Sequence, residues 1–303
     1  MKQLMIVALL VVAVGGCKEE KVATSHATDA AHVATVNSNS VHASSINTNS
    51  VDSVTFPDGP EGIAAKRGFA ILAATRDSLP GYVGNGLRCF SCHLDNGRRP
   101  NAMPLTGVYA RYPKYTTRDG RELTIQDRVN NCLRRSMAGR NLSADSKEMH
   151  DIVTYLALVS RGIAVGSDVP GEGLPKMPPL TGDTVRGVAI FGARCARCHG
   201  ANGAGIPPAT AVWGPRSYAI GASLARVERA ASFIRHNMPF DSAGVLDDQQ
   251  AYDVAAYIVS QSRQNSRGVE NDWPNGGAPG DVPYNTKGHV AFNPPRHLTS
   301  PVF

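Results

Sequence analysis

Apolar and polar positions follow the same order in two parts of the chain. Arg67–Ile71 and Arg186–Ile190 differ in residue type at one position, and each opens an apolar helical stretch. Asp151–Tyr155 and Asp253–Tyr257 share their first and last residues and lie in segments with apolar residues at three- and four-residue steps, as in amphipathic helices. These closing helices are expected to begin at Asp145 and Asp247. The pattern predicts an all-α fold built from one domain repeated twice.

Each copy carries the motif C-x-x-C-H, at Cys89–His93 and Cys195–His199. This is the attachment motif of c-type haem, so the sequence predicts two covalently bound haems c. The expected attachment residues are Cys89, Cys92, Cys195 and Cys198, and the first axial ligands are His93 and His199. A zinc site needs a matched second pair of ligands, and a thioredoxin-like site does not need the histidine. The domain order resembles the small all-α cytochrome c fold, present twice.

The two copies differ in the residue expected at the second axial position of each iron. Counting 39 positions on from each motif histidine reaches Cys132 in the first copy and Met238 in the second. Methionine opposite histidine is the usual pair of an electron-carrying cytochrome c and raises its potential. A thiolate stabilises ferric iron instead. Cys132 could also be a small buried residue on an apolar helix face. Rival ligands are His236 and Met177 for the second iron, and Met103, Met137, Met149 and His150 for the first.

The chain is strongly basic around Cys132. Between positions 98 and 140 there are nine arginines and one lysine against three acidic residues, whereas the whole chain has a net charge of +6. The arginines are Arg98, Arg99, Arg111, Arg118, Arg121, Arg128, Arg134, Arg135 and Arg140. Cationic neighbours lower the pKa of a thiol, and guanidinium groups match oxyanions. We therefore expect a thiolate at Cys132 and a small anionic substrate that reacts with a sulfur nucleophile. Some of these arginines are expected to bind haem propionates or surface carboxylates instead.

The first residues predict export and a lipid anchor. A short basic start precedes an apolar run, Leu4–Val14, that is too short to span a bilayer. Small residues stand directly before Cys17, as in a lipobox, so we interpret residues 1–16 as a signal peptide and Cys17 as a lipidated N-terminus. An ordinary signal peptide cut near this point is the alternative. Haem c is attached outside the cytoplasm, and we expect the protein at the periplasmic face of a bacterial membrane, held by its lipid anchor.

The remaining boundaries follow from composition. Residues 17–55 are rich in Ser, Asn, Thr, Ala and Val and predict a flexible tether. We expect a first cytochrome c-like domain at residues 56–165, a linker at 166–180 and a second domain at 181–262. Residues 263–303 are expected to form an irregular Pro/Gly-rich tail that wraps the domains or lies disordered.

The segment around Cys132 resembles a family motif. Arg128–Arg140 reads R-V-N-N-C-L-R-R-S-M-A-G-R and fits the pattern R-[IV]-N-x-C-x-x-R-S-M-x-G-R of the dihaem thiosulfate dehydrogenases. Two haem motifs, a cysteine for the first iron and a methionine for the second extend the resemblance from about Arg67 to Ser262. Members of this family join two thiosulfates into tetrathionate and release two electrons, and some run the reverse reaction.

The resemblance implies that Cys132 is both an axial ligand and the catalytic nucleophile, and that Arg118 and Arg128 bind the anion. Electrons would pass through the second haem to an external acceptor, such as another cytochrome c, and no nucleic acid partner is expected. Two features depart from the family. Asn237 stands beside the distal methionine where some members have lysine, so ligand exchange by that neighbour is not expected. A lipid anchor is also not a general family feature.

Three other functions fit part of the pattern. A non-enzymatic dihaem electron carrier explains the two haems but not Cys132 or the density of arginines. A subunit of a larger sulfur-oxidising cytochrome complex would also have a cysteine-ligated haem. A dihaem cytochrome c peroxidase needs an open iron, which a thiolate at the repeat position does not provide.

Overall fold

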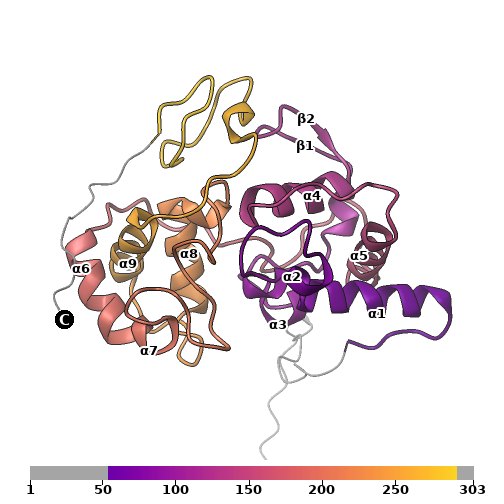
Figure 1. The fold of residues 1–303 in the computed structure, drawn as a ribbon, viewed down its shortest axis with the longest axis horizontal. Helices are drawn as coiled ribbons and strands as arrows, with labels where there is room; N and C mark the ends of the chain where they lie inside the picture. Colours follow the sequence, from indigo (N-terminus) through magenta and orange to yellow (C-terminus); the bar gives the residue numbers. More distant parts are fainter. Residues whose placement is uncertain (1–53, 292–303) are drawn as a thin grey trace, which may run out of the picture. The chain divides into compact units, whose positions relative to one another are not determined.

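Two groups of helices follow one another along the chain, and an irregular segment follows the second group (Figure 1). The structure is a computed structural model that describes residues 54–291, all within the unit Ser50–Phe303. The expected signal peptide, Cys17 and nearly all of the expected tether lie outside the described residues, as do residues 292–303. In the described range, no helix combines the length and the apolar character that crossing a membrane requires.

The first copy contains α1 to α5 (Figure 1). Its α-helices are α1 (Pro60–Ala73), α2 (Thr75–Ser78), α3 (Leu94–Gly97), α4 (Ile125–Asn131) and α5 (Lys147–Leu158). Its other turns are the 3-10 helices Cys89–Ser91 and Tyr109–Arg111 and a π-helical turn, Cys132–Ser136, that continues α4. The first haem motif therefore begins on a 3-10 helix, and Cys132 lies where α4 passes into the π-helical turn.

The second copy repeats this order with shorter connections. Its elements are α6 (Thr184–Ile190), the π-helical turn Phe191–Cys195, α7 (Ala196–His199), the 3-10 helix Ser223–Ala225, α8 (Val227–Asn237) and α9 (Asp248–Ser260). Helices dominate both copies, which confirms the expected all-α character of the two domains.

One ion pair explains why the repeated segments match. In the first copy, Arg67 on α1 binds both carboxylate oxygens of Asp151 on α5, with nitrogen–oxygen distances of 2.6 Å. In the second copy, Arg186 on α6 binds Asp253 on α9 at 2.6 and 2.9 Å. The same guanidinium–carboxylate pair thus joins the opening and closing helices of each copy.

A glycine after each of these arginines lets the paired helices touch. A Cβ atom on Gly68 would lie 2.0 Å from the backbone oxygen of Asp151, and one on Gly187 would lie 2.2 Å from that of Asp253. No side chain fits at either crossing, because real Cβ contacts are not this short. The repeated Arg-Gly pair therefore marks one helix crossing that the chain uses twice.

The starts of the closing helices follow their capping side chains. Asp247 accepts a hydrogen bond from Gln250 N and forms a capping box, as its position in the sequence predicted. The prediction of Asp145 was wrong by one position, because the hydroxyl of Ser146 caps α5 by accepting from Met149 N at 3.2 Å. Both side chains can cap a helix, and the tertiary path of the chain selects the serine.

A short β-hairpin is an addition that the sequence pattern did not predict. Strands β1 (Lys114–Thr116) and β2 (Arg121–Leu123) are antiparallel, with Lys114 opposite Leu123. Strands of three residues are too short to show a period of two in the sequence. The hairpin brings Arg118, in its turn, towards the C-terminal part of the chain.

The two copies share the first hydrophobic core. Tyr218, Leu224 and Phe233 of the second copy are buried in the same cluster as Leu72 and Leu133 of the first. A separate cluster forms around α8 and α9 of the second copy. The first copy therefore depends on the second for part of its apolar interior.

An insertion in the first copy fastens the two copies together. Twenty-two positions separate Arg67 from the first motif cysteine, against 9 in the second copy. Within this insertion, buried Asn85 donates from Nδ2 to Ser136 O at 3.0 Å in the first copy and to Ser217 O at 2.9 Å in the second. One buried amide thus bonds to backbone groups of both copies.

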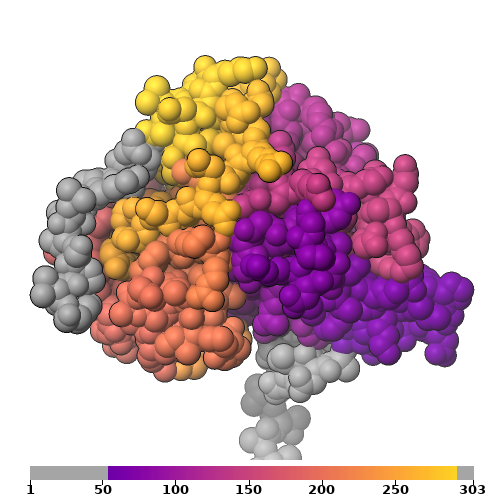
Figure 2. Space-filling view, in the orientation of Figure 1, coloured from indigo at the N-terminus to yellow at the C-terminus, as the bar shows by residue number. Residues whose placement is uncertain are grey.

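The segment after α9 also packs against both copies. Val269, Trp273, Val282 and Tyr284 form a small buried cluster of their own. Figure 2 shows the segment, in yellow, in contact with surfaces of both copies. The described part of the expected tail, residues 263–291, is therefore folded onto the domains.

Candidate functional site

Each motif histidine is held by a hydrogen bond between Nδ1 and a backbone oxygen. His93 Nδ1 lies 2.5 Å from Met103 O, and His199 Nδ1 lies 2.8 Å from Thr210 O. Donation from Nδ1 leaves the Nε2 lone pair for a metal, and such partners orient ligating histidines. The Met103 peptide is placed in turn by the linker, because Met103 N donates to Gly173 O at 2.8 Å.

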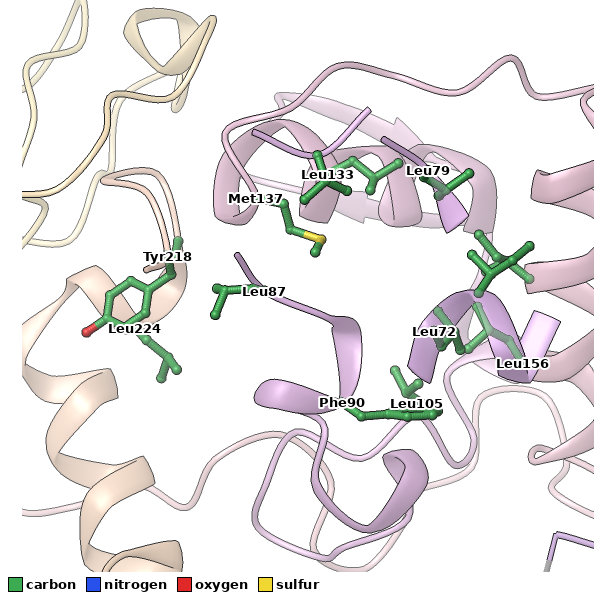
Figure 3. Close-up of a cluster of buried hydrophobic side chains, with 14 of the residues drawn as sticks. Leu72, Leu79, Leu87, Phe90, Leu105, Leu133, Met137, Leu156, Tyr218 and Leu224 are labelled. Atoms are coloured by element: carbon green, nitrogen blue, oxygen red, sulfur yellow. The ribbon is translucent and has the colours of Figure 1, made fainter. Parts of the chain in front are cut away.

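An apolar cavity is lined by the first motif. Its wall carries Cys89, Cys92, His93 and Cys132 together with leucines of the first copy and Tyr218 and Leu224 of the second. Figure 3 shows Leu133 and Met137 above an open space and Phe90 and Leu105 below it, with Leu87 on the side of Tyr218 and Leu224. An apolar wall, two motif cysteines and a histidine held through Nδ1 fit a c-type haem.

The second motif has the same local arrangement beside its own aromatic cluster. Phe191 packs against Trp213 and Tyr257 with ring centroids 4.9 and 5.6 Å apart. Met238 packs against the cores of both copies. The motif cysteines and the oriented histidine of this copy therefore also fit a haem.

Cys132 is directly bonded to a cation. Arg128 Nη1 donates to Cys132 Sγ at 2.9 Å, from four residues earlier on the same helical face. Burial alone would raise the pKa of the Cys132 thiol, but the charge of Arg128 and the hydrogen bond and charge of His93 outweigh it and lower the pKa to about 6. The expected thiolate therefore has a physical basis in two neighbours that the fold places beside the sulfur.

The structure separates the rival ligands. Met149 is fully buried in the core and does not line the cavity, and the side chain of His150 is 72% exposed. Met103 and Met137 do line the cavity together with Cys132. Among these three sulfurs, Cys132 is the one to which a guanidinium donates in the described part of the chain.

For the second iron, the rivals of Met238 also lie in or beside the second copy. His236 Nδ1 is bonded to Ser232 O of its own helix at 2.8 Å. Met177, in the linker, packs at the edge of the second core.

A polar cavity adjoins the apolar one. The two cavities share Arg128, Ser136 and Ser223, and the polar cavity is also lined by Arg118 and Arg135. An anion in the polar cavity therefore meets the guanidinium that contacts the Cys132 sulfur. The expected Arg118 and Arg128 do come together at this cavity.

Most of the local positive charge is neutralised by the protein itself. Six of the nine arginines between positions 98 and 140 have a carboxylate within 4.0 Å, namely Arg99, Arg111, Arg118, Arg121, Arg134 and Arg135. The charge count alone therefore overstated the free positive charge of the predicted basic cleft. Arg118, which is paired with Asp272, and Arg128 both line the polar cavity.

Sequence reasoning gave no role to several polar residues of this cavity, among them Tyr112, Ser136 and Ser223. Tyr112 and Ser223 carry no motif, and Ser136 was part of the family motif without an assigned role. Burial raises the pKa of Tyr112, although Arg128 opposes the shift, so its hydroxyl stays protonated as a hydrogen-bond donor. Tyr112 and Ser223 lie more than 100 positions apart in sequence, and only the tertiary structure brings them to one cavity.

Comparison with protein families agrees with this geometry. Residues 83–165 match the family described as SoxA/TsdA, cytochrome c domain, and residues 184–262 match the family described as Cytochrome c. The chain is thus a c-type cytochrome with two tandem cytochrome c domains.

Individual relatives narrow this class. The chain is 40% identical to the thiosulfate dehydrogenase of Psychrobacter arcticus over 76% of this chain and 73% of the relative. It is 39% identical to that of Allochromatium vinosum over 68% of this chain and 81% of the relative. The chain belongs to the thiosulfate dehydrogenase family and is an oxidoreductase, which confirms the resemblance drawn from its sequence.

A solved relative supports the same fold. The structure of the thiosulfate dehydrogenase from Marichromatium purpuratum matches with a TM-score of 0.66 and 32% sequence identity, over 70% of this chain and 49% of that chain. The present chain therefore spans about half the length of that relative.

Proposed function

We propose that this protein couples two thiosulfate ions into tetrathionate, or runs the reverse reaction, at Cys132. One contact supports this function above the others, the 2.9 Å hydrogen bond from Arg128 to Cys132 Sγ where the apolar and polar cavities adjoin. It places an activated sulfur nucleophile beside a cation and an anion-sized polar space. Relatives covering most of the chain are named thiosulfate dehydrogenases, which supports the choice of substrate.

Two covalently bound haems c complete the proposed enzyme. Cys89 and Cys92 would hold the first and Cys195 and Cys198 the second. His93 and Cys132 would bind the first iron, and His199 and Met238 the second. When bound, the two haems supply the acceptor for the two electrons of the reaction. The backbone bonds that orient His93 and His199 support the histidine assignments.

The chemistry of the chain's own residues balances as two sulfur–sulfur couplings. The Cys132 thiolate bonds to the outer sulfur of a first thiosulfate, and this coupling releases two electrons. The outer sulfur of a second thiosulfate attacks that same sulfur and displaces the Cys132 thiolate. Tetrathionate leaves, the thiolate is restored, and no proton is needed in either step.

The arginines offset the repulsion between the anions. Two unit negative charges 4 Å apart repel by roughly 4 kcal/mol at an effective dielectric constant of 20. Arg128 and Arg118 line the polar cavity, and Ser136, Ser223 and Tyr112 provide hydroxyl groups there. We assign Arg128 and Arg118 to anion binding, with Arg128 also stabilising the thiolate.

Electrons leave through the second copy to an external acceptor, such as another cytochrome c. Cys198 of the second motif is exposed, whereas the first motif lines a cavity partly closed by the second copy. The second haem would therefore lie nearer to a partner. The lipid anchor at Cys17 and the periplasmic membrane location remain part of this proposal.

A single assay tests the function. The holoprotein should convert thiosulfate to tetrathionate with ferricyanide as the electron acceptor. Cys132→Ala should abolish turnover while both haems remain attached, because the attachment cysteines are untouched. Full turnover by the Cys132→Ala variant would show that another group performs the coupling, and haem reduction by a partner protein without any sulfur turnover would identify an electron carrier.

A further inference from the structure

The C-terminal segment supplies a buried carboxylate to the arginines of the polar cavity. Asp272 is 2% exposed and accepts hydrogen bonds from Arg118 Nε at 2.8 Å and from Arg135 Nη2. Arg118 and Arg135 both line the polar cavity, whereas Asp272 lies behind them and is not part of the lining. Asp272 is separated from Arg118 by 154 positions, so the pairing exists only in the folded chain.

Tyr284 of the same segment binds both members of this pair. Its hydroxyl donates to Asp272 Oδ2 at 2.7 Å and accepts from Arg118 Nη2 at 2.6 Å. Arg118 Nη2 also donates to Gly221 O of the second copy at 2.7 Å. The guanidinium of Arg118 is therefore held by the C-terminal segment and the second copy, although the residue belongs to the hairpin of the first.

The backbone and an aromatic ring complete the hold on Arg118. Trp273 N donates to Arg118 O at 2.8 Å, and the guanidinium carbon of Arg118 lies 5.0 Å from the centre of a Trp273 ring. Trp273 adopts a φ of 53°, which is a strained value for a bulky residue. Strain of this kind persists only where surrounding contacts over-determine the conformation, as they do around Arg118.

We propose that residues 263–291 are a third component of the substrate site, in which Asp272 and Tyr284 are positioning residues for Arg118. This inference rests on the proposed function. A dianion binds most tightly to cationic side chains whose orientation is fixed before it arrives. Binding then costs no free energy for ordering those side chains. The segment therefore sets the affinity for thiosulfate, while Cys132 and Arg128 carry the chemistry.

The test uses the holoprotein with Tyr284→Phe. This variant keeps the ring and the charges and removes only the hydroxyl between Asp272 and Arg118. We expect KM for thiosulfate to rise about tenfold, the equivalent of one hydrogen bond to a charged group, with kcat changed by about twofold or less. The melting temperature should fall by no more than about 4 °C.

Two further variants separate positioning from folding. Asp272→Asn should raise KM as well, but it leaves Arg135 without its buried countercharge and is expected to unfold at lower temperature. Tyr252→Phe removes a buried hydroxyl from α9 of the second copy, which lines neither cavity, and should leave KM unchanged.

The outcomes are distinguishable. Wild-type turnover together with an unchanged KM in Tyr284→Phe would overturn the role of the C-terminal segment and leave the proposed function intact. No thiosulfate turnover by the wild-type holoprotein would overturn the proposed function and this inference with it. The proposed function and this inference would both be supported by a raised KM and a normal kcat in Tyr284→Phe, provided that Tyr252→Phe behaves as wild type.

Discussion

At the scale of single residues, the Arg128–Cys132 pair defines the site. The two residues lie four apart, so the local helix already places them on one face. The hydrogen bond of 2.9 Å from Arg128 to Cys132 Sγ depends on the fold, and so does the position of His93 near this sulfur. The sequence predicted the thiolate from the density of arginines. In the structure a single arginine, Arg128, is the largest influence that lowers the pKa of Cys132, and many of the others are paired with carboxylates.

Replacing Arg128 should change the pH dependence of turnover. The thiolate is the reactive form, so activity should be full above the Cys132 pKa of about 6 and fall as the pH drops through it. Arg128→Gln removes the largest influence that lowers this pKa, and the acidic limb of kcat/KM should therefore move to higher pH. The profile is measured with ferricyanide as the acceptor.

Arg121→Gln is the matched control for this measurement. Arg121 is exposed, is paired with Asp127 at 3.0 Å, and lines neither cavity. Its variant should keep the wild-type profile. An acidic limb that stays in place in Arg128→Gln would mean that Arg128 does not control the ionisation of the sulfur.

At the scale of secondary structure, the repeated opening and closing helices form the frame of each copy. Their order and type were predictable, because an amphipathic period and a repeated Arg-Gly pair are local signals. The hairpin of β1 and β2 was not predictable. Its strands are only three residues long, and no pattern in the nearby sequence indicates that it packs against the C-terminal segment. Yet this hairpin carries Arg118 to the polar cavity.

The helix crossing gives a prediction for stability. Gly187→Ala would place a Cβ 2.2 Å from Asp253 O, so α6 and α9 must move apart. We expect a loss of about 1–3 kcal/mol in the free energy of unfolding, as for other overpacked sites. Urea unfolding followed by circular dichroism measures this loss.

Gly192→Ala provides the comparison within the same copy. A Cβ at Gly192, in the π-helical turn after α6, meets nothing within 4 Å. Its variant should be neutral or up to about 1 kcal/mol more stable, since alanine favours helix over glycine. Equal stability of the two variants would show that α6 and α9 tolerate separation at Gly187.

At the scale of the whole molecule, the two copies and the C-terminal segment build one site together. Tyr218 and Leu224 of the second copy line the cavity of the first motif, and Asn85 bonds to backbone groups of both copies. The first cytochrome domain is thus completed by the second. Division into two domains, which the sequence predicts well, understates this dependence.

A substitution in the second copy should therefore perturb the first haem. Leu224→Ala shortens a side chain that lines the first cavity and should cost about 2–5 kcal/mol of stability. It should also change the absorption spectrum or midpoint potential assigned to the histidine–cysteine haem. Redox titration of the holoprotein resolves the two haems.

Leu246→Ala is the control, because Leu246 is buried in the second copy's own core. It should destabilise the protein by a similar amount while leaving the first haem's potential as in the wild type. If both variants shifted that potential equally, the effect would report general loosening and not the wall of the first cavity.

The sequence by itself determined the parts of this protein whose signals are local. These are the two haem motifs, the helical repeat, the cysteine at position 132 with Arg128 four residues before it, and the family. Only the tertiary structure decided which arginines keep their charge available, because that depends on carboxylates such as Asp272, which lies 137 positions from Arg135. It also decided that the second copy closes the first cavity and that the C-terminal segment holds Arg118. Contacts between distant segments arise from packing of the complete chain, and no short stretch of sequence encodes them.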